Sequence, residues 1–284
     1  MKKSRRHALE DLGVVTAARG DIRVEVLNDR LEPKVPFPHR HDFYHLHFIE
    51  KGKGTHRIDF KTYSLDRNQI YVMKPGQVHA WDISPGVKGI VLEFTSESLP
   101  QDLRKNLDLM SGVNSLPDMM TLKNQQDIRR IQSVCESMLQ EFQNQKSAYQ
   151  IVLQHQLSEL LILLLRLSGA EVSVQKPLEN LMDQFQSLLD ESFSQEHSVE
   201  FYAKKLGMTP KALTMRASRA FGKSAREMIQ ERVLVEAKRL LVYSKLSISE
   251  VGYQLGYQDP NYFIRFFREN VGVTPLAFRS RSGI

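Results

Sequence analysis

The stretch EVGYQLGYQDPNYFIRFFRENVGVTPLAFR, residues 250–279, contains two short amphipathic patterns separated by a glycine. The Leu-Gly pair that ends at Gly256 provides a tight turn, after which Asp259 and Pro260 form the N-cap and first position of a second helix. Gly272 ends that helix. A helix, a glycine turn and a second helix in this order predict a helix-turn-helix unit.

The same pattern occurs upstream, so the region contains an internal repeat. YAKKLGMTP at 202–210 matches VGYQLGYQD at 251–259 at the Leu-Gly pair, and a Gly-x-Ser/Thr stop follows in both copies. The helix between the copies, from about Ser224 to Leu241, is roughly 27 Å long at ~1.5 Å per residue. It could set two second helices about one DNA turn apart, ~34 Å. One such unit is a weak signal, whereas two in tandem, with basic residues on both second helices, predict a DNA-binding domain.

The composition of the whole chain fits this reading. The 284 residues are 41% hydrophobic and 25% charged, which is typical of about two soluble domains. The net charge is +6, and from Lys204 onward basic residues outnumber acidic ones more than twofold, which favours a polyanionic partner. Cys135 is the only cysteine, which excludes an intrachain disulfide and favours a cytoplasmic location. No apolar run reaches the ~18 residues that span a bilayer and no signal peptide is evident, so no membrane partner is expected.

The 250–279 stretch resembles the C-terminal signature of the AraC/XylS family of bacterial transcription regulators, and the likeness extends over about a hundred residues. The matching residues are Gly256, Pro260, Tyr262, Phe263, Phe266, Phe267, Gly272, Thr274, Pro275 and Phe278. The resemblance implies a sensor whose ligand state controls how paired DNA-binding domains engage double-stranded promoter DNA and RNA polymerase.

The second helix of the downstream unit can be sorted by side chain. Four aromatic residues are too apolar to face DNA and are expected to pack the subdomain: Tyr262, Phe263, Phe266 and Phe267. By resemblance, Asn261, Ile264 and Arg265 read base edges, since Arg suits guanine, Asn suits adenine and Ile could touch a thymine methyl. Arg268 is expected on phosphate. The alternative is that these are solvated helix residues without a DNA contact.

The upstream unit departs from the family pattern. Its expected DNA-contacting residues are Lys211, Thr214, Met215 and Arg219. Met215 stands where relatives often have Arg, and Arg216 and Ala217 stand where they have apolar core residues. Either Arg216 extends toward phosphate or this helix is slightly rotated.

Residues 21–94 contain six or more short apolar segments separated by turn signals, which predicts a small antiparallel barrel or sandwich. This part resembles the cupin-like sensor domain of many AraC/XylS regulators. The chain is thus expected to be an α+β protein. Its expected organisation is a sensor domain over 1–120, a helical dimerisation segment over 121–170, a linker over 171–180, and a DNA-binding domain over 181–282 with helix-turn-helix units at about 199–221 and 248–270.

Two helices are expected between 124 and 168. The second is apolar on two faces around Leu160 and Leu164. A helix that is apolar on two faces must be covered on both. One face is expected to pack on its own domain and the other on a second copy of the chain, which predicts a homodimer. The alternative is a helix fully buried within one domain.

The stretch PHRHDFYHLHF at 38–48 places four histidines at positions of one parity, which share a face in an extended strand. The spacing of His39, His41 and His45 matches the first cupin motif, with His45 where glutamate is usual, and His79 supplies the remaining ligand position. These four could surround a divalent metal, and four imidazoles without a carboxylate suit Zn, Ni or Cu. The family resemblance instead favours an effector pocket without a cofactor, lined by His39, His41, His45, His79 and Trp81.

Two functions therefore stand against each other. The first is a transcription regulator that senses a small-molecule effector and has no catalytic residues. The second is a cupin metalloenzyme, such as an isomerase or dioxygenase, with a nucleic-acid-binding tail. The tandem repeat favours the regulator, because an enzyme has no need of two recognition helices at this separation.

Overall fold

The computed structural model describes residues 14–15, 20–27, 38–100, 103, 109–169 and 180–281. The described residues divide into two compact units, one within 14–169 and the other within 180–281. Nearly all of the linker expected at 171–180 lies outside the described residues.

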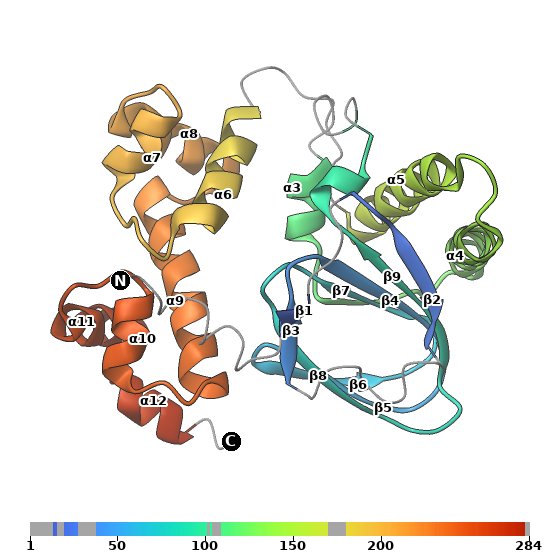
Figure 1. Cartoon of the computed structure of the whole chain (residues 1–284), viewed down its shortest axis with the longest axis horizontal. Helices are drawn as coiled ribbons and strands as arrows, with labels where there is room; N and C mark the ends of the chain where they lie inside the picture. Colours follow the sequence, from blue (N-terminus) through green and yellow to red (C-terminus); the bar gives the residue numbers. More distant parts are fainter. Residues whose placement is uncertain are drawn as a thin grey trace. The chain divides into compact units, whose positions relative to one another are not determined.

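The N-terminal unit contains two five-stranded sheets (Figure 1). The first has the order β1 (Val14–Val15), β3 (His39–His41), β8 (Val78–Ile83), β5 (Gly54–Ile58), β6 (Lys61–Leu65). The second has the order β10 (Met119–Thr121), β7 (Gln69–Met73), β4 (Tyr44–Lys51), β9 (Lys88–Phe94), β2 (Arg23–Val26). Among the described strands, all pairings are antiparallel except the short β1–β3 pair, in agreement with the predicted antiparallel barrel.

The second sheet is buried on both sides. Along β4, Leu46 and Phe48 join a large apolar cluster with the neighbouring helices, whereas Ile49 joins a separate cluster inside the barrel. Successive side chains of a strand point to opposite faces, so one strand serves two cores. The helices that cover the outer face are α3 (Leu109–Ser115), α4 (Gln125–Asn144) and α5 (Tyr149–Ser168) (Figure 1).

Helix α5 differs from its sequence expectation. Leu160 and Leu164 are fully buried in the outer cluster of their own unit, and Leu163 and Leu165 on the other apolar face are buried there too. These leucines therefore do not form the expected contact with a second copy. By length and composition α5 is also a candidate membrane span, but a core helix has the same composition, and these side chains lie in a protein core.

The C-terminal unit is helical throughout. Its helices are α6 (Asn180–Ser192), α7 (Val199–Lys205), α8 (Pro210–Phe221), α9 (Ala225–Tyr243), α10 (Ile248–Gln254), α11 (Pro260–Val271) and α12 (Pro275–Arg281). One apolar cluster contains buried residues from every one of these helices except α12. Phe278 of α12 is half-buried and packs against the edge of this cluster. The two helix-turn-helix pairs, α7–α8 and α10–α11, therefore share a core with α9.

The helix starts follow the sequence signals. The Thr209 hydroxyl accepts a hydrogen bond from the Ala212 amide at 3.2 Å, and the Asp259 carboxylate accepts one from the Asn261 amide at 2.9 Å. Ser224 opens α9 with a reciprocal capping box. An N-cap of this kind is typically worth about 1 kcal/mol. The predicted starts of α8, α9 and α11 are confirmed.

Candidate functional site

Helices α8 and α11 have equal lengths, and their positions correspond at an offset of 50 residues. Leu213 and Phe263 are fully buried at one pair of equivalent positions, and Ala217 and Phe267 at another. The intervening positions also share their exposure in the two helices. Helix α8 is therefore not rotated relative to α11, and Arg216 is half-buried like its equivalent Phe266.

Most of the predicted DNA-contacting residues are exposed. The exposed ones are Lys211, Met215, Arg219, Asn261, Arg265 and Arg268. Thr214 and Ile264, which are equivalent, are half-buried. Ile264 packs against the apolar core, so its expected place on the exposed side is wrong in part.

Tyr262 was expected to pack the subdomain, and this expectation is wrong because its side chain is 61% exposed. The Arg265 guanidinium carbon lies 5.5 Å from the centre of the Tyr262 ring, within the range of a cation–π contact. The aromatic residue type alone did not show on which face of the helix Tyr262 lies. The helix buries only the face that contains Phe263 and Phe267. The tyrosine therefore adds an aromatic ring to the exposed basic face of α11.

The histidines of the N-terminal unit come from both sheets. His39 and His41 lie on β3, with His79 directly opposite His39 on β8. His45 and His47 lie on β4 of the other sheet. The expectation that four histidines share a face of one strand is therefore wrong, because the chain changes sheets between His41 and His45.

The imidazole rings of the two sheets meet inside the barrel. His41 Nε2 lies 2.8 Å from His79 Nε2, and His79 Nδ1 lies 3.2 Å from His56 Nε2. His45 Nε2 lies 3.2 Å from His47 Nε2, and the His41 and His45 ring centres are 4.7 Å apart. All five residues are buried. A neutral imidazole has one donor and one acceptor nitrogen, so such rings can form chains of hydrogen bonds.

Burial sets the charge of these rings. Desolvation lowers the pKa of His56 to about 3. It also lowers the pKa of His79 well below its usual value, and the neighbouring histidines, beginning with His56 and His41, shift it further in the same direction. Both rings are thus neutral at pH 7 and keep a lone pair for a ligand or a hydrogen bond.

The surroundings of the histidines include residues that the sequence did not single out. Glu93 on β9 is buried, and its Oε1 lies 3.7 Å from His45 Nε2, so the site has a carboxylate after all. His56 was also missed. A signal existed for Glu93, since it is the only charged residue in the apolar segment GIVLEF. Half-buried Trp81 lies with its ring centre 4.8 Å from that of His47.

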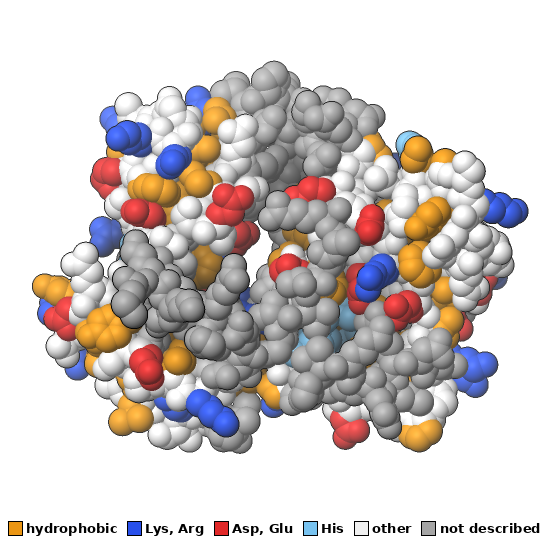
Figure 2. Space-filling view, viewed as in Figure 1, with side chains coloured by type: hydrophobic (Ala, Val, Ile, Leu, Met, Phe, Trp, Pro, Cys, Tyr) orange, Lys and Arg blue, Asp and Glu red, His pale blue; other side chains and the backbone are white. Residues whose placement is uncertain are grey.

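Three of the histidines form a candidate metal-binding group. One ring nitrogen from each of His39, His41 and His79 lies within 4.8 Å of the other two, and these three residues could hold a metal ion. His45 faces this group from the other sheet. In the space-filling view, pale-blue histidine surface is visible within the N-terminal unit (Figure 2). The arrangement offers nitrogen donors and one buried carboxylate to a small ligand.

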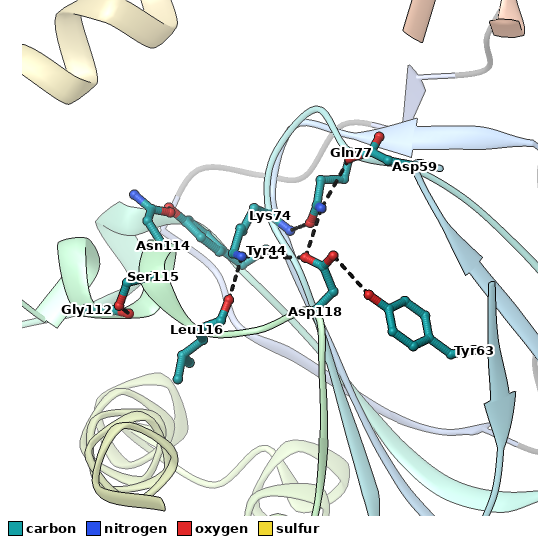
Figure 3. A network of polar contacts seen from close by, with 10 residues as sticks. All are labelled: Tyr44, Asp59, Tyr63, Lys74, Gln77, Gly112, Asn114, Ser115, Leu116 and Asp118. Carbon is teal, nitrogen blue, oxygen red and sulfur yellow. Dashed lines mark hydrogen bonds and ion pairs between the residues drawn. The ribbon is translucent and has the colours of Figure 1, made fainter. Parts of the chain in front are cut away.

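A polar network holds the turn before His79 (Figure 3). Gln77 Nε2 donates to the carboxylates of Asp118 at 3.1 Å and Asp59 at 3.2 Å. Lys74 Nζ lies 3.6 Å from Asp118 Oδ1, and burial lowers the pKa of Lys74 while Asp118 opposes that shift. The β7–β8 turn is thus tied to the β5–β6 turn and to the segment that follows α3.

Two family models match the chain. The model of the AraC-like ligand binding domain matches residues 27–165, and that of a helix-turn-helix domain matches residues 202–281. Together they cover most of the chain and both compact units.

Similar proteins include the HTH-type transcriptional activators RhaR and RhaS of Enterobacter sp. (strain 638). Each is 23% identical to this chain over 265 residues; the alignments cover 89% and 88% of this chain and 90% and 91% of the relatives. Among solved structures, ToxT from Vibrio cholerae strain SCE256 with bound unsaturated fatty acid is 16% identical and has a TM-score of 0.43. That alignment covers 91% of this chain and 95% of ToxT.

Proposed function

Because the chain belongs to the AraC family of DNA-binding transcription regulators, we propose that α8 and α11 read two successive segments of a promoter. The match between these helices in length, capping and buried positions carries the proposal. Equivalent helices on one shared core can present equivalent faces to successive major grooves. The ligand-binding domain then acts as the sensor for a small effector.

The two helices have different tasks in this proposal. In α11, Arg265 and Asn261 read base edges, and Arg268 contacts phosphate. In α8, Lys211 and Met215 occupy the equivalent reading positions, and Thr214 and Arg219 contribute smaller contacts, as Ile264 does in α11. Met215 is 64% exposed and has no charge, so it suits an apolar contact such as a thymine methyl.

The effector changes the balance between two arrangements of the paired DNA-binding domains through its different affinity for each. His39, His41, His45, His79 and Trp81 line the effector site. We propose activation as the outcome, through a contact with RNA polymerase in the cytoplasm, since the similar RhaR and RhaS proteins are described as activators. The proposed role is regulatory and not enzymatic, and the metalloenzyme alternative is not favoured.

The regulator is proposed to act as a homodimer. Because Leu160 and Leu164 lie in the core, we place the dimer contact on the outward side of α4 and α5, where Ile151 and Val152 are exposed apolar residues. A dimer gives two DNA-binding domains per complex and raises affinity through effective concentration. Sedimentation of the full chain should report a dimer, and Ile151→Asp with Val152→Asp should shift it to monomer. Phe60→Asp, at an exposed apolar residue of the β5–β6 turn, is the control and should leave the dimer intact.

Binding of the full chain to genomic DNA fragments tests the function directly. We expect binding whose affinity falls steeply with salt, because phosphate contacts release counterions. Arg265→Ala should weaken binding at the selected sites more than at unrelated DNA. Failure of the wild-type chain to bind any DNA at low salt would remove the proposal.

A further inference from the structure

The barrel interior has the chemistry of a metal site, and the metal-binding group of His39, His41 and His79 is compact and buried. His39 and His79 are direct partners across β3 and β8, so regular strand pairing holds two of the three rings side by side. Such a site is built on strands and not on loops, which keeps the ligand atoms in register.

The distances fit a small ion. Two imidazole nitrogens that bind one tetrahedral ion at ~2.0–2.1 Å lie about 3.3 Å apart. His41 Nε2 and His79 Nε2 are 2.8 Å apart as hydrogen-bonded neighbours. An ion would therefore replace this hydrogen bond after the two rings separate by roughly half an ångström.

His56, which is not part of the sequence motif, contacts the second ring nitrogen of His79. Its Nε2 lies 3.2 Å from His79 Nδ1, which leaves His79 Nε2 directed toward His41. Histidines that bind metals usually have their other ring nitrogen fixed by a hydrogen bond of this kind. His56 is therefore a positioning residue for His79.

The donor set selects the class of ion. Three imidazoles suit zinc, nickel, copper or cobalt and are poor ligands for magnesium or calcium, which prefer oxygen. The buried Glu93 side chain beside His45, on the opposite sheet, supplies negative charge across the barrel from the group when it is ionised. This lowers the cost of placing a dication in a protein interior.

We propose that the barrel binds one late first-row divalent ion through His39, His41 and His79, positioned by His56, and that this ion is the effector or an essential part of it. The regulatory part of the proposal rests on the proposed function, whereas the binding site stands on the histidine geometry alone.

The test uses the full chain purified without an affinity tag, stripped with EDTA and titrated with zinc or nickel chloride in competition with a coloured chelator. We expect one ion per chain. His41→Gln and His79→Gln should weaken binding by at least tenfold, and His56→Gln by roughly 10–100-fold with the stoichiometry kept. His155→Gln, at an exposed histidine on α5, is the matched control and should bind like the wild type. A wild-type chain that binds neither ion, or variants that bind as tightly as wild type, would overturn the site.

A measurement on the wild type covers the case in which a variant does not fold. Copper-loaded protein should give an electron paramagnetic resonance spectrum with couplings from several imidazole nitrogens. A spectrum of oxygen ligands alone would contradict the proposal.

Measurements of DNA binding distinguish the ion-binding site from the ion's proposed role as effector. The ion should change the affinity or pattern of DNA binding by the wild-type chain and should have no such effect on His79→Gln. Metal binding without that change would refute the effector role. DNA binding that persists while no ion binds would refute the site and leave the proposed function standing.

Discussion

The upstream pair α7–α8 and the downstream pair α10–α11 are two copies of one helix-turn-helix unit. Both second helices begin with a side-chain cap followed by proline, and both end at a glycine in the left-handed region, Gly222 or Gly272. Their exposed residues share almost nothing, since Lys211 and Met215 correspond to Asn261 and Arg265. Turns, caps and buried positions therefore fix the geometry, while the exposed positions are left to specify the DNA sequence.

The buried positions are not equal in size. Where α11 buries Phe267, α8 buries Ala217, and the neighbouring position is Phe266 in one helix and Arg216 in the other. The downstream unit thus has a heavier aromatic core, with Tyr257 and Phe278 beside its phenylalanines. The upstream unit shares its apolar cluster with α6 and α9.

The largest expected effect on stability tests this difference in the size of the buried residues. Phe267→Ala should lower the free energy of unfolding of the C-terminal unit by about 3–5 kcal/mol, because it leaves a large cavity. Ala217→Gly should cost only about 1 kcal/mol. Urea unfolding followed by circular dichroism at the helix band measures both. Trp81, the only tryptophan, lies in the barrel, so its fluorescence is an internal control that should not shift. Equal losses for the two variants would refute the difference in packing.

The turn glycines give the next effect. Gly207 and Gly256 both have positive φ, but a Cβ at Gly207 would meet open space, whereas one at Gly256 would lie 2.7 Å from the Ser194 carbonyl oxygen. Gly207→Ala should cost about 1–2 kcal/mol of unfolding free energy for the left-handed backbone alone. Gly256→Ala should cost a further 1–3 kcal/mol, roughly, for the overpacked contact. Urea unfolding followed by circular dichroism measures both losses. A larger loss of unfolding free energy for Gly207→Ala than for Gly256→Ala would contradict the prediction.

The exposed positions should differ in DNA affinity. Arg265→Ala should cost about 1–3 kcal/mol at a selected site and relax the preference at one base pair. Met215→Ala should cost less than about 1 kcal/mol, since it removes only one apolar contact. Fluorescence anisotropy with the selected site and single-base variants measures both terms. If Met215→Ala cost as much as Arg265→Ala, the assignment of roles to the two helices would be reversed.

The smallest effect concerns phosphate. Arg268→Ala should lower the slope of log affinity against log salt by about one unit, and should do so on any DNA sequence. Ser218 is the equivalent residue of α8, is also exposed and has no charge. Ser218→Ala should leave the slope unchanged. Parallel salt plots for the wild type and Arg268→Ala would mean that Arg268 does not contact the backbone.

The parts of the fold that were predictable depend on local signals. Thr209 and Asp259 could be identified as caps because a cap acts within one helical turn of its own sequence. Tyr262 was misplaced because an aromatic residue type does not reveal which side of a helix meets a core. Leu160 and Leu164 were likewise misjudged, since only the fold shows that both faces of α5 are covered within one unit.

The barrel interior was predictable only in part. His39, His41, His45 and His79 could be found from spacing, yet spacing gave no sheet membership, and the chain crosses between sheets inside the motif. His56 and Glu93 lie on strands β5 and β9, which approach the motif only after the sheets have formed. Contacts between residues distant in sequence are determined by sheet order, which a local pattern does not contain.

Sequencing the genomic fragments that the purified full chain retains is the most direct test of the central claim that α8 and α11 each read one segment of DNA. We expect a motif with two blocks of preferred bases, centred about one helical turn or ~10 base pairs apart. Arg265→Ala should erase preference within one block, and Lys211→Ala with Met215→Ala should weaken preference within the other. A single block, no enrichment, or loss of both blocks in either variant would contradict it.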